Sequence, residues 1–362
     1  MVKMGWRGSA SWVAVFALTA WAVACKSKDD GAASAKAARA VEAKPAPTLV
    51  FAASSNLRVL DGDAGQVVGR LDMLKTVNEI AFSRDGATAY LAASDGVRAV
   101  DTTTFELKAK LTENPARFVE LSDDGGRLFV LEHFVTKNED GTRTVHPFSM
   151  VTLEVATGAV LSKVEIGDRV RYARPSEGPG RHSLVVYESN EVVLGRPTEP
   201  LGKGRELNPA AGIQPEGAWQ IRQTVAYQAG HVYLPVEGTP ARIMDVNLDS
   251  GEVRNLSLGR PAALRGLALT PDGATVLANT GDGLVWLDAA SGAVTGELAL
   301  PGGLMGCAVR GDGKQAFIAK TIDEKGGAVL TVDVEAKSLL AKAHLDDISP
   351  WAIGVAPGAS AR

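Results

Sequence analysis

A short module recurs along this chain, and its length limits what the chain can fold into. In each copy an apolar strand runs into a turn that ends in Asp-Gly, and a second apolar strand follows. A third strand ends in Asp, and a fourth closes the unit. The turn is plainest at Gly86, Gly125, Gly273 and Gly313, spaced by 39 residues in the first pair and 40 in the last. Units of about 40–50 residues with four strands each are typical of β-propeller blades.

Two further copies are degraded. One spans roughly Val170 to Leu201 and has Pro175 to Gly180 in place of the Asp-Gly turn, and the other spans Ala218 to Leu258. At the chain ends the module is split. Thr48 to Leu71 holds a second, third and fourth strand, whereas Trp351 to Gly358 holds a first strand and a turn. Pairing the two would close the ring and remove exposed sheet edges.

We therefore expect an all-β chain with a single seven-bladed propeller over residues 48–358 and a disordered tail at 359–362. Six or eight blades are the alternatives, because the degraded region fixes the count poorly.

The best copies resemble a known repeat family. Ile80 to Gly86 reads as an apolar strand followed by Ser-Arg-Asp-Gly, Ala89 to Ala92 reads Ala-Tyr-Leu-Ala, and Val97 to Asp101 ends in Asp. This pattern is similar to the YVTN-type, quinoprotein-amine-dehydrogenase-like propeller repeat. The resemblance implies the fold but not one function, since that family includes lactonases, dehydrogenase subunits, surface-layer proteins and plain binding scaffolds.

The first 24 residues are typical of a secretory signal peptide. Lys3 and Arg7 precede an uncharged stretch from Trp12 to Ala24, which is shorter than a membrane-spanning helix requires. Cys25 follows directly, and the segment resembles a bacterial lipobox, although Ala22 stands where leucine is usual. That resemblance implies lipid on Cys25 and attachment to the membrane.

Residues 25–47 are rich in Ala, Lys and Pro and lack an apolar pattern, so we expect a flexible tether. By resemblance to enterobacterial sorting rules, Lys26 after the lipidated cysteine favours the outer membrane. We expect an exported, lipid-anchored protein that faces the periplasm or the cell surface.

Composition limits the classes of partner that this protein can bind. A formal net charge of −4 gives no basic surface for nucleic acid. The sequence holds two cysteines, so lipidation of Cys25 would leave Cys307 without a disulfide partner, as a small residue of an apolar strand. We expect a monomeric propeller.

One mouth of the central channel is the first candidate site. The mouth is built by the loops that enter the first strands and by those between second and third strands. Counting back along each first strand gives seven positions: Asn78, Arg117, Arg171 (or Tyr172), Arg222 (or Ile221), Arg265, Met305 and Trp351. Because arginine binds carboxylate and phosphate in a bidentate manner, these arginines could hold an anionic ligand or an acidic loop of a partner. Alternatively they pair with acidic neighbours such as Glu79, Glu120 and Asp282.

The longest insertion is the second candidate site. It runs from Glu132 to Ser149, between the second and third strands of blade 3. Long loops on a rigid scaffold are often functional. Its candidate residues are Glu132, His133, Arg143 and His146. Glu132 with His133 could act as an acid–base pair, and a polar surface loop is the alternative.

No pattern in the sequence indicates a metal site, a cofactor or a catalytic residue set. The five histidines follow no zinc-binding spacing, and no nucleophile elbow or phosphate-binding glycine loop is present. We therefore expect a non-enzymatic scaffold that binds a protein or another envelope partner through the channel mouth and the blade-3 loop. A lactonase-like hydrolase using carboxylates and arginines at that mouth, or a subunit of a quinone-cofactor redox complex, is the alternative.

Overall fold

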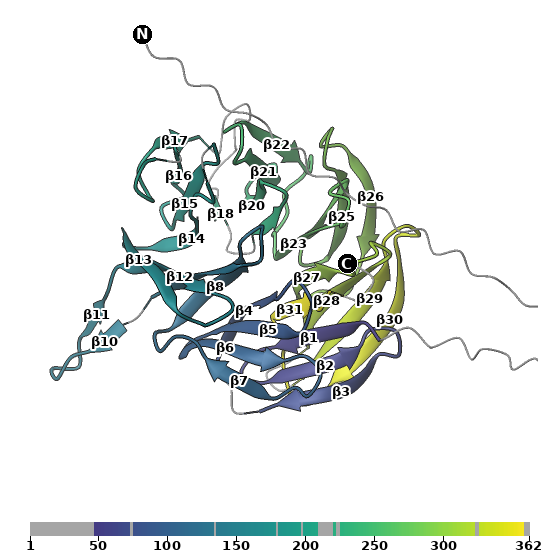
Figure 1. Cartoon of the computed structure of the whole chain (residues 1–362). Helices are drawn as coiled ribbons and strands as arrows, with labels where there is room; N and C mark the ends of the chain where they lie inside the picture. The colour runs from purple at the N-terminus through teal and green to yellow at the C-terminus, as the bar shows by residue number, and fades with distance from the viewer. Residues whose placement is uncertain are drawn as a thin grey trace, which may run out of the picture. The chain divides into compact units, whose positions relative to one another are not determined.

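Seven antiparallel sheets follow one another around a central axis, so the chain folds as a seven-bladed β-propeller (Figure 1). The computed structural model describes residues 47–72, 75–133, 135–178, 180–196, 198–208, 220–221, 225–322 and 326–357, which belong to one compact unit, Pro45–Arg362. The predicted signal peptide (1–24), Cys25, nearly all of the tether, Arg222 and the tail at 359–362 lie outside the described residues.

In the first three blades the strands succeed one another from the axis outward. Blade 1 consists of β31 (Ala352–Val355), β1 (Leu49–Ala53), β2 (Leu57–Asp61) and β3 (Gln66–Leu71). Blade 2 consists of β4 (Val77–Phe82), β5 (Thr88–Ala93), β6 (Gly96–Asp101) and β7 (Leu107–Lys110). Blade 3 consists of β8 (Ala116–Leu121), β9 (Arg127–Glu132), β12 (Phe148–Glu154) and β13 (Val160–Gly167), and between its second and third strands it carries a hairpin, β10 (Val135–Lys137) and β11 (Arg143–Val145).

The other four blades follow the same order. Blade 4 consists of β14 (Val170–Arg174), β15 (Ser183–Tyr187), β16 (Val192–Gly195) and β17 (Arg205–Leu207). In blade 5 two short inner strands, β18 (Gln220–Ile221) and β19 (Ala226–Gln228), both pair with β20 (His231–Glu237), which is followed by β21 (Arg242–Asn247) and β22 (Val253–Ser257). Blade 6 consists of β23 (Gly266–Leu269), β24 (Thr275–Asn279), β25 (Gly283–Asp288) and β26 (Val294–Ala299). Blade 7 consists of β27 (Leu304–Val309), β28 (Gln315–Thr321), β29 (Gly327–Asp333) and β30 (Ser338–Leu345).

The predicted closure of the ring is confirmed. The C-terminal strand β31 pairs antiparallel with β1, with Phe51 opposite Gly354, and so supplies the inner strand of blade 1. Trp351 precedes β31, and its indole N–H donates to the carbonyl of Val77 on β4 at 2.5 Å. The two ends of the described chain thus complete one sheet, and that sheet is tied to the next blade.

Burial explains why the strands read as continuous apolar runs. The second strands lie between two neighbouring blades and are buried on both faces, as in β5, where five consecutive residues from Ala89 to Ala93 are buried. The outer strands have no neighbour on one side, and all four residues of β7 are exposed. The core is therefore a ring of apolar clusters between adjacent blades.

The Asp-Gly turns link the first and second strands through one recurrent arrangement. In blade 2 the Ser83 hydroxyl donates to the carboxylate of Asp85 at 2.6 Å, and the backbone N–H of Ala87 donates to the same carboxylate oxygen at 3.0 Å. Gly86 then takes a φ of 68°, in the left-handed region that glycine enters without steric cost. The Asp-Gly pattern of the sequence repeat therefore arises from the requirements of this turn.

The degraded blade 4 is longer than its predicted end at Leu201. Its fourth strand begins at Arg205, because two tight turns, closed by the backbone bonds from Glu199 to Arg196 and from Lys203 to Pro200, precede it. The blade-3 insertion also holds more order than a loop, since it forms the hairpin β10–β11.

Alternating strand directions give the propeller two distinct faces. The loops that lead into the inner strands and those between second and third strands share one face, which we call the entry face. The turns between first and second strands and between third and fourth strands share the other, which we call the opposite face. No helix in the described residues is long and apolar enough to cross a membrane.

Candidate functional site

The candidate mouth residues within the described part of the chain all lie at the start of inner strands, on the entry face. Asn78, Arg117 and Arg171 lie within the first two residues of β4, β8 and β14, and Arg265 and Trp351 directly precede β23 and β31. Asn78 donates from its side-chain amide to the carbonyl of Ala116 at 2.9 Å, which links blades 2 and 3. Trp351 remains 40% exposed although its indole N–H is bonded.

Two of the mouth arginines meet at one acidic residue. Arg117 forms an ion pair with the Glu188 carboxylate at 2.9 Å and also donates to the carbonyl of Val170 at 3.2 Å. Arg171 donates to the backbone carbonyl of Glu188 at 3.2 Å. Glu188 lies in the loop between the second and third strands of blade 4, so it was not among the acidic neighbours expected from the sequence. Arg265 is exposed, and its side chain makes no hydrogen bond or ion pair to another described residue.

The base of the blade-3 hairpin is fastened to this arginine pair. The ring of His133 stacks on that of Phe148, with centroids 4.5 Å apart and planes at 22°. The guanidinium of Arg117 lies 5.1 Å from the centre of the same Phe148 ring, a cation–π contact. Burial, with the nearby charge of Arg117, holds the pKa of His133 below its usual value. The hairpin therefore rises from a base in which His133, Phe148 and Arg117 are stacked on one another.

Beyond this base the hairpin is open to solvent, and it projects from blade 3 at the rim of the ring (Figure 1). Val135 lies directly opposite Val145, and Lys137 directly opposite Arg143. Because side chains two apart on a strand share a face, these four form one exposed surface, the hairpin face: two valines followed by two cations.

The remaining candidates of this insertion have separate partners. The carboxylate of Glu132 is buried and accepts hydrogen bonds from Lys163 at 2.8 Å and Asn114 at 3.0 Å. His146 shares a hydrogen bond of 2.5 Å with the hydroxyl of Thr136. Glu132 thus contacts the sheet, whereas His133 contacts Phe148, and no hydrogen bond between these two described residues joins them as an acid–base pair.

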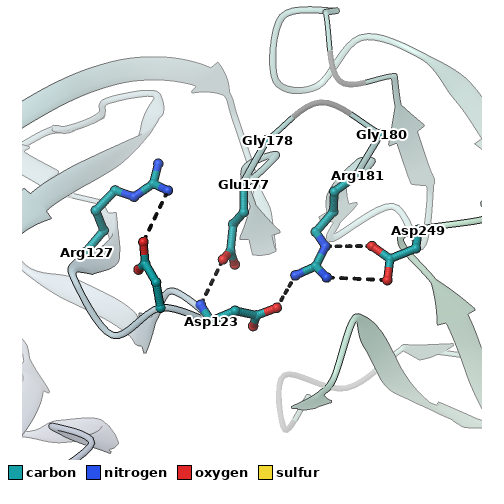
Figure 2. A pocket seen from close by; sticks show the side chains of 8 residues that line it. Asp123, Arg127, Glu177, Gly178, Gly180, Arg181 and Asp249 are labelled. Atoms are coloured by element: carbon teal, nitrogen blue, oxygen red, sulfur yellow. Dashed lines mark hydrogen bonds and ion pairs between the residues drawn. The ribbon is translucent and has the colours of Figure 1, made fainter. Parts of the chain in front are cut away.

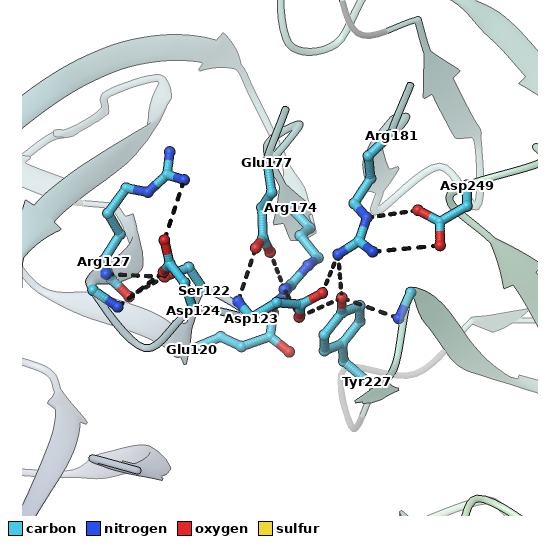
Figure 3. A network of polar contacts seen from close by, with 12 residues as sticks. Glu120, Ser122, Asp123, Asp124, Arg127, Arg174, Glu177, Arg181, Tyr227 and Asp249 are labelled. Atoms are coloured by element: carbon cyan, nitrogen blue, oxygen red, sulfur yellow. Dashed lines mark hydrogen bonds and ion pairs between the residues drawn. The ribbon is translucent and has the colours of Figure 1, made fainter. Parts of the chain in front are cut away.

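A larger polar network occupies the opposite face. Of its members, only Glu120 had been named from the sequence, as a neighbour with which an arginine of the mouth could pair. At its centre Arg174, at the end of β14, is fully buried. Its guanidinium forms ion pairs with Glu120 at 2.5 Å, with Asp123 at 3.2 Å and with Glu177 (Figure 3). It also lies over the Tyr227 ring. Three blades meet at this one cation, because these partners come from blades 3, 4 and 5.

Arg181 extends the network to the surface. It forms ion pairs with Asp123 and, at 2.7 Å, with Asp249 in a turn of blade 5. Tyr227 donates from its hydroxyl to Asp123 at 2.6 Å. Burial alone would raise the pKa of Asp123, but the hydrogen bonds from Tyr227 and Arg181 and the charge of Arg174 outweigh it and hold that pKa below its usual value.

These groups line a polar pocket of about 570 Å³ between blades 3, 4 and 5 (Figure 2). Its walls include Asp123, Arg127, Glu177, Arg181 and Asp249. Every carboxylate among these five is already bonded to an arginine or to a backbone N–H. The arrangement joins blades 3, 4 and 5 electrostatically. No three acidic, histidine or cysteine side chains in the described residues are placed to hold a metal ion.

One signal in the sequence could have found this network. Blade 4 departs from the repeat at Pro175 to Gly180, where Glu177 and the following Arg181 replace the usual Asp-Gly turn. Glu177 accepts the backbone N–H of Asp123, which belongs to the intact turn of blade 3. The departure from the repeat is therefore where blade 4 pairs with its neighbour.

Comparison with known proteins supports the propeller fold but identifies no family and no function. No protein-family model and no curated protein matches this chain. Among solved structures, it is similar to a functionally unknown protein from Desulfotomaculum acetoxidans, at 12% identity and a TM-score of 0.66, over 86% of this chain and 100% of that one.

Two further solved structures are also similar to this chain. The dihydro-heme d1 dehydrogenase NirN matches with 16% identity and a TM-score of 0.57, over 86% of this chain and 75% of that one. Apo AztD from Citrobacter koseri matches with 14% identity and a TM-score of 0.58, over 86% of this chain and 98% of that one. At such low identities the likeness concerns the fold, and by that fold the chain is a seven-bladed β-propeller.

Proposed function

We propose that this protein is a non-enzymatic binding scaffold of the cell envelope, and that it holds a protein partner against the blade-3 hairpin and the adjoining channel mouth. Lipid on Cys25 would anchor it to the outer membrane, and residues 25–47 would tether the propeller. The observation that carries the proposal is the hairpin face.

The hairpin face contains two unfavourable features, a pair of like charges and a pair of exposed valines, and no other contact within the described part of the hairpin compensates for them. Lys137 and Arg143 are directly opposite each other, and like charges in this position destabilise a strand pair. Val135 and Val145, the neighbouring pair, are 41% and 55% exposed. A partner that covers the valines with apolar groups and meets the cations with carboxylates would relieve both costs at once.

The base gives this surface a fixed position. A hairpin with a mobile base would lose conformational entropy when it binds, whereas the Arg117–Phe148–His133 stack already orders the segment that carries it. The mouth adds a second contact area, since Trp351 is exposed there and Arg265 is unpaired among the described residues.

The test is recovery of a partner after crosslinking in intact cells, with a tagged full-length protein. In one variant the cations are reversed, Lys137→Glu with Arg143→Glu. Its control changes the other side of the same hairpin, Thr136→Ser with Thr144→Ser. We expect one specific partner with the wild type and the control, and its loss with the charge reversal.

Recovery of the same partner by the charge-reversed variant would overturn the proposal. Turnover of a lactone by the purified protein, abolished by Glu188→Gln, would support the hydrolase alternative instead.

A further inference from the structure

A second pocket on the opposite face is lined by basic side chains that have no role in the proposed function. It lies between blades 4 and 5, has a volume of about 550 Å³, and is lined by Arg196, Arg205, His182 and Glu199, with Leu194, Gly204, Ser250 and Gly251. Pockets that bind small molecules are typically of this size. The lining thus contains two arginines and a histidine but only one carboxylate, that of Glu199.

That carboxylate is already engaged. An oxygen of Glu199 accepts the backbone N–H of Arg196 at 2.7 Å, which closes the turn after β16. It therefore stabilises the loop on which Arg196 stands. The side chain of Arg196 itself is exposed and makes no hydrogen bond or ion pair to another described residue.

Arg205 is held in place by one of its five N–H groups. Its Nη2 donates to the carbonyl of Gly251 at 2.8 Å, across the boundary between blades 4 and 5. The described residues supply no partner for the remaining N–H groups. A guanidinium fixed at one corner retains the parallel N–H groups that bind an oxyanion in a bidentate manner.

His182 is oriented in a similar way. Its Nδ1 is 2.9 Å from the carbonyl oxygen of Leu248. Because a carbonyl only accepts, Nδ1 must carry the proton, and Nε2 is the remaining polar atom of the ring. Gly251 adjoins this ring with a φ of 73°, and a Cβ there would lie 3.4 Å from Nε2. Glycine therefore leaves space beside the imidazole that a larger residue would fill.

We propose that this pocket, which we call the blade 4–5 pocket, binds a small anionic ligand through a phosphate or carboxylate group, held by Arg196 and Arg205 with His182 beside them. It is a site separate from the hairpin face, because it lies on the opposite face of the propeller. A partner could therefore be bound at the hairpin while the anion is bound in the blade 4–5 pocket.

The experiment is titration calorimetry of the purified mature protein with three probes at constant ionic strength: inorganic phosphate, glycerol phosphate and succinate. Phosphate and succinate separate the two oxyanion classes, and glycerol phosphate shows whether an organic group adds affinity. Arg196→Gln and Arg205→Gln remove one guanidinium each, and Arg205→Lys keeps the charge but loses the bidentate geometry. Arg70→Gln, an exposed arginine on β3 of blade 1, is the matched control.

We expect saturable binding of at least one probe, a loss of about tenfold or more in affinity with either glutamine variant, and no change with Arg70→Gln. Arg205→Lys should lie between wild type and Arg205→Gln. Because both arginines are exposed, and only Arg205 loses a hydrogen bond, to Gly251, the melting temperature without ligand should change little, which separates lost binding from lost folding. Absence of saturable binding at millimolar concentrations, or equal binding by all variants, would overturn the proposal.

Discussion

The guanidinium of Arg174 lies 3.3 Å from the centre of the Tyr227 ring, so β14 of blade 4 is joined to β19 of blade 5 by a fully buried cation. Replacing Arg174 by Met should cost about 3–5 kcal/mol of unfolding free energy, because Glu120 and Asp123 would lose their buried partner. Urea denaturation followed by fluorescence measures this loss.

A surface ion pair provides the comparison. Arg260 forms an ion pair with Glu297 at 3.2 Å while both side chains are partly exposed, and Arg260→Gln should cost less than about 1 kcal/mol. If Arg174→Met were no more destabilising than this control, the network would not be the junction between blades 3, 4 and 5.

Glu79 on the inner strand β4 should make stability fall as pH rises. Burial, with the charge of Glu120, raises the pKa of Glu79 from 4.5 to about 7. Between these two values the folded protein keeps a proton that the unfolded chain has released, so each step up in pH favours unfolding. Glu79→Gln removes this titration and should be more stable than wild type at pH 8.

The measurement is the free energy of unfolding of both proteins at pH 5 and pH 8. The advantage of Glu79→Gln should be larger at pH 8 than at pH 5. An advantage that is equal at the two pH values would show that the carboxyl group of Glu79 does not titrate in this window.

Gly354 on the closing strand β31 has no room for a side chain. A Cβ there would lie 2.8 Å from the Phe82 ring of blade 2. We expect Gly354→Val to destabilise the propeller by about 1–3 kcal/mol through overpacking where the ring closes. Gly311→Ala is the control, since among the described residues nothing beyond its two chain neighbours lies within 4 Å of its Cβ position. Thermal melts of the two variants should differ clearly, and equal melting temperatures would contradict the tight closure.

The cysteines give a test of the lipid anchor. Burial raises the pKa of the Cys307 thiol to about 12, so at pH 8 the reactive thiolate is scarce. Native protein extracted from membranes should therefore resist alkylation. After denaturation we expect one reactive thiol per chain, because lipidated Cys25 has none. Two reactive thiols per chain would contradict the lipid anchor.

The sequence was sufficient for the ring because the same turn is repeated in several blades. The turn around Asp85 and Gly86 uses only neighbours along the chain, so its pattern can be read without knowledge of distant contacts. The split blade followed from counting strands at both ends, and β31 indeed pairs with β1. Even the degraded blades 4 and 5 kept their inner and middle strands.

The candidate sites were harder to predict from the sequence, because their contacts join residues that are far apart in the chain. Arg117 was selected by its position in a strand, but its partner Glu188 lies in another blade, and the register of one blade against the next is not written in a local motif. Arg174 was missed for the same reason. Its carboxylate partners become neighbours only after blades 3 and 4 have packed together.

The most direct test of the central proposal is site-specific photo-crosslinking in living cells. A photoreactive amino acid is placed at Val135 or Val145 on the hairpin face, and at Val294, an exposed valine on β26 of blade 6, as the control. If the hairpin face holds a partner protein, both hairpin positions should crosslink to that same partner and position 294 should not. No adduct at either hairpin position, or the same adduct from position 294, would contradict the scaffold proposal.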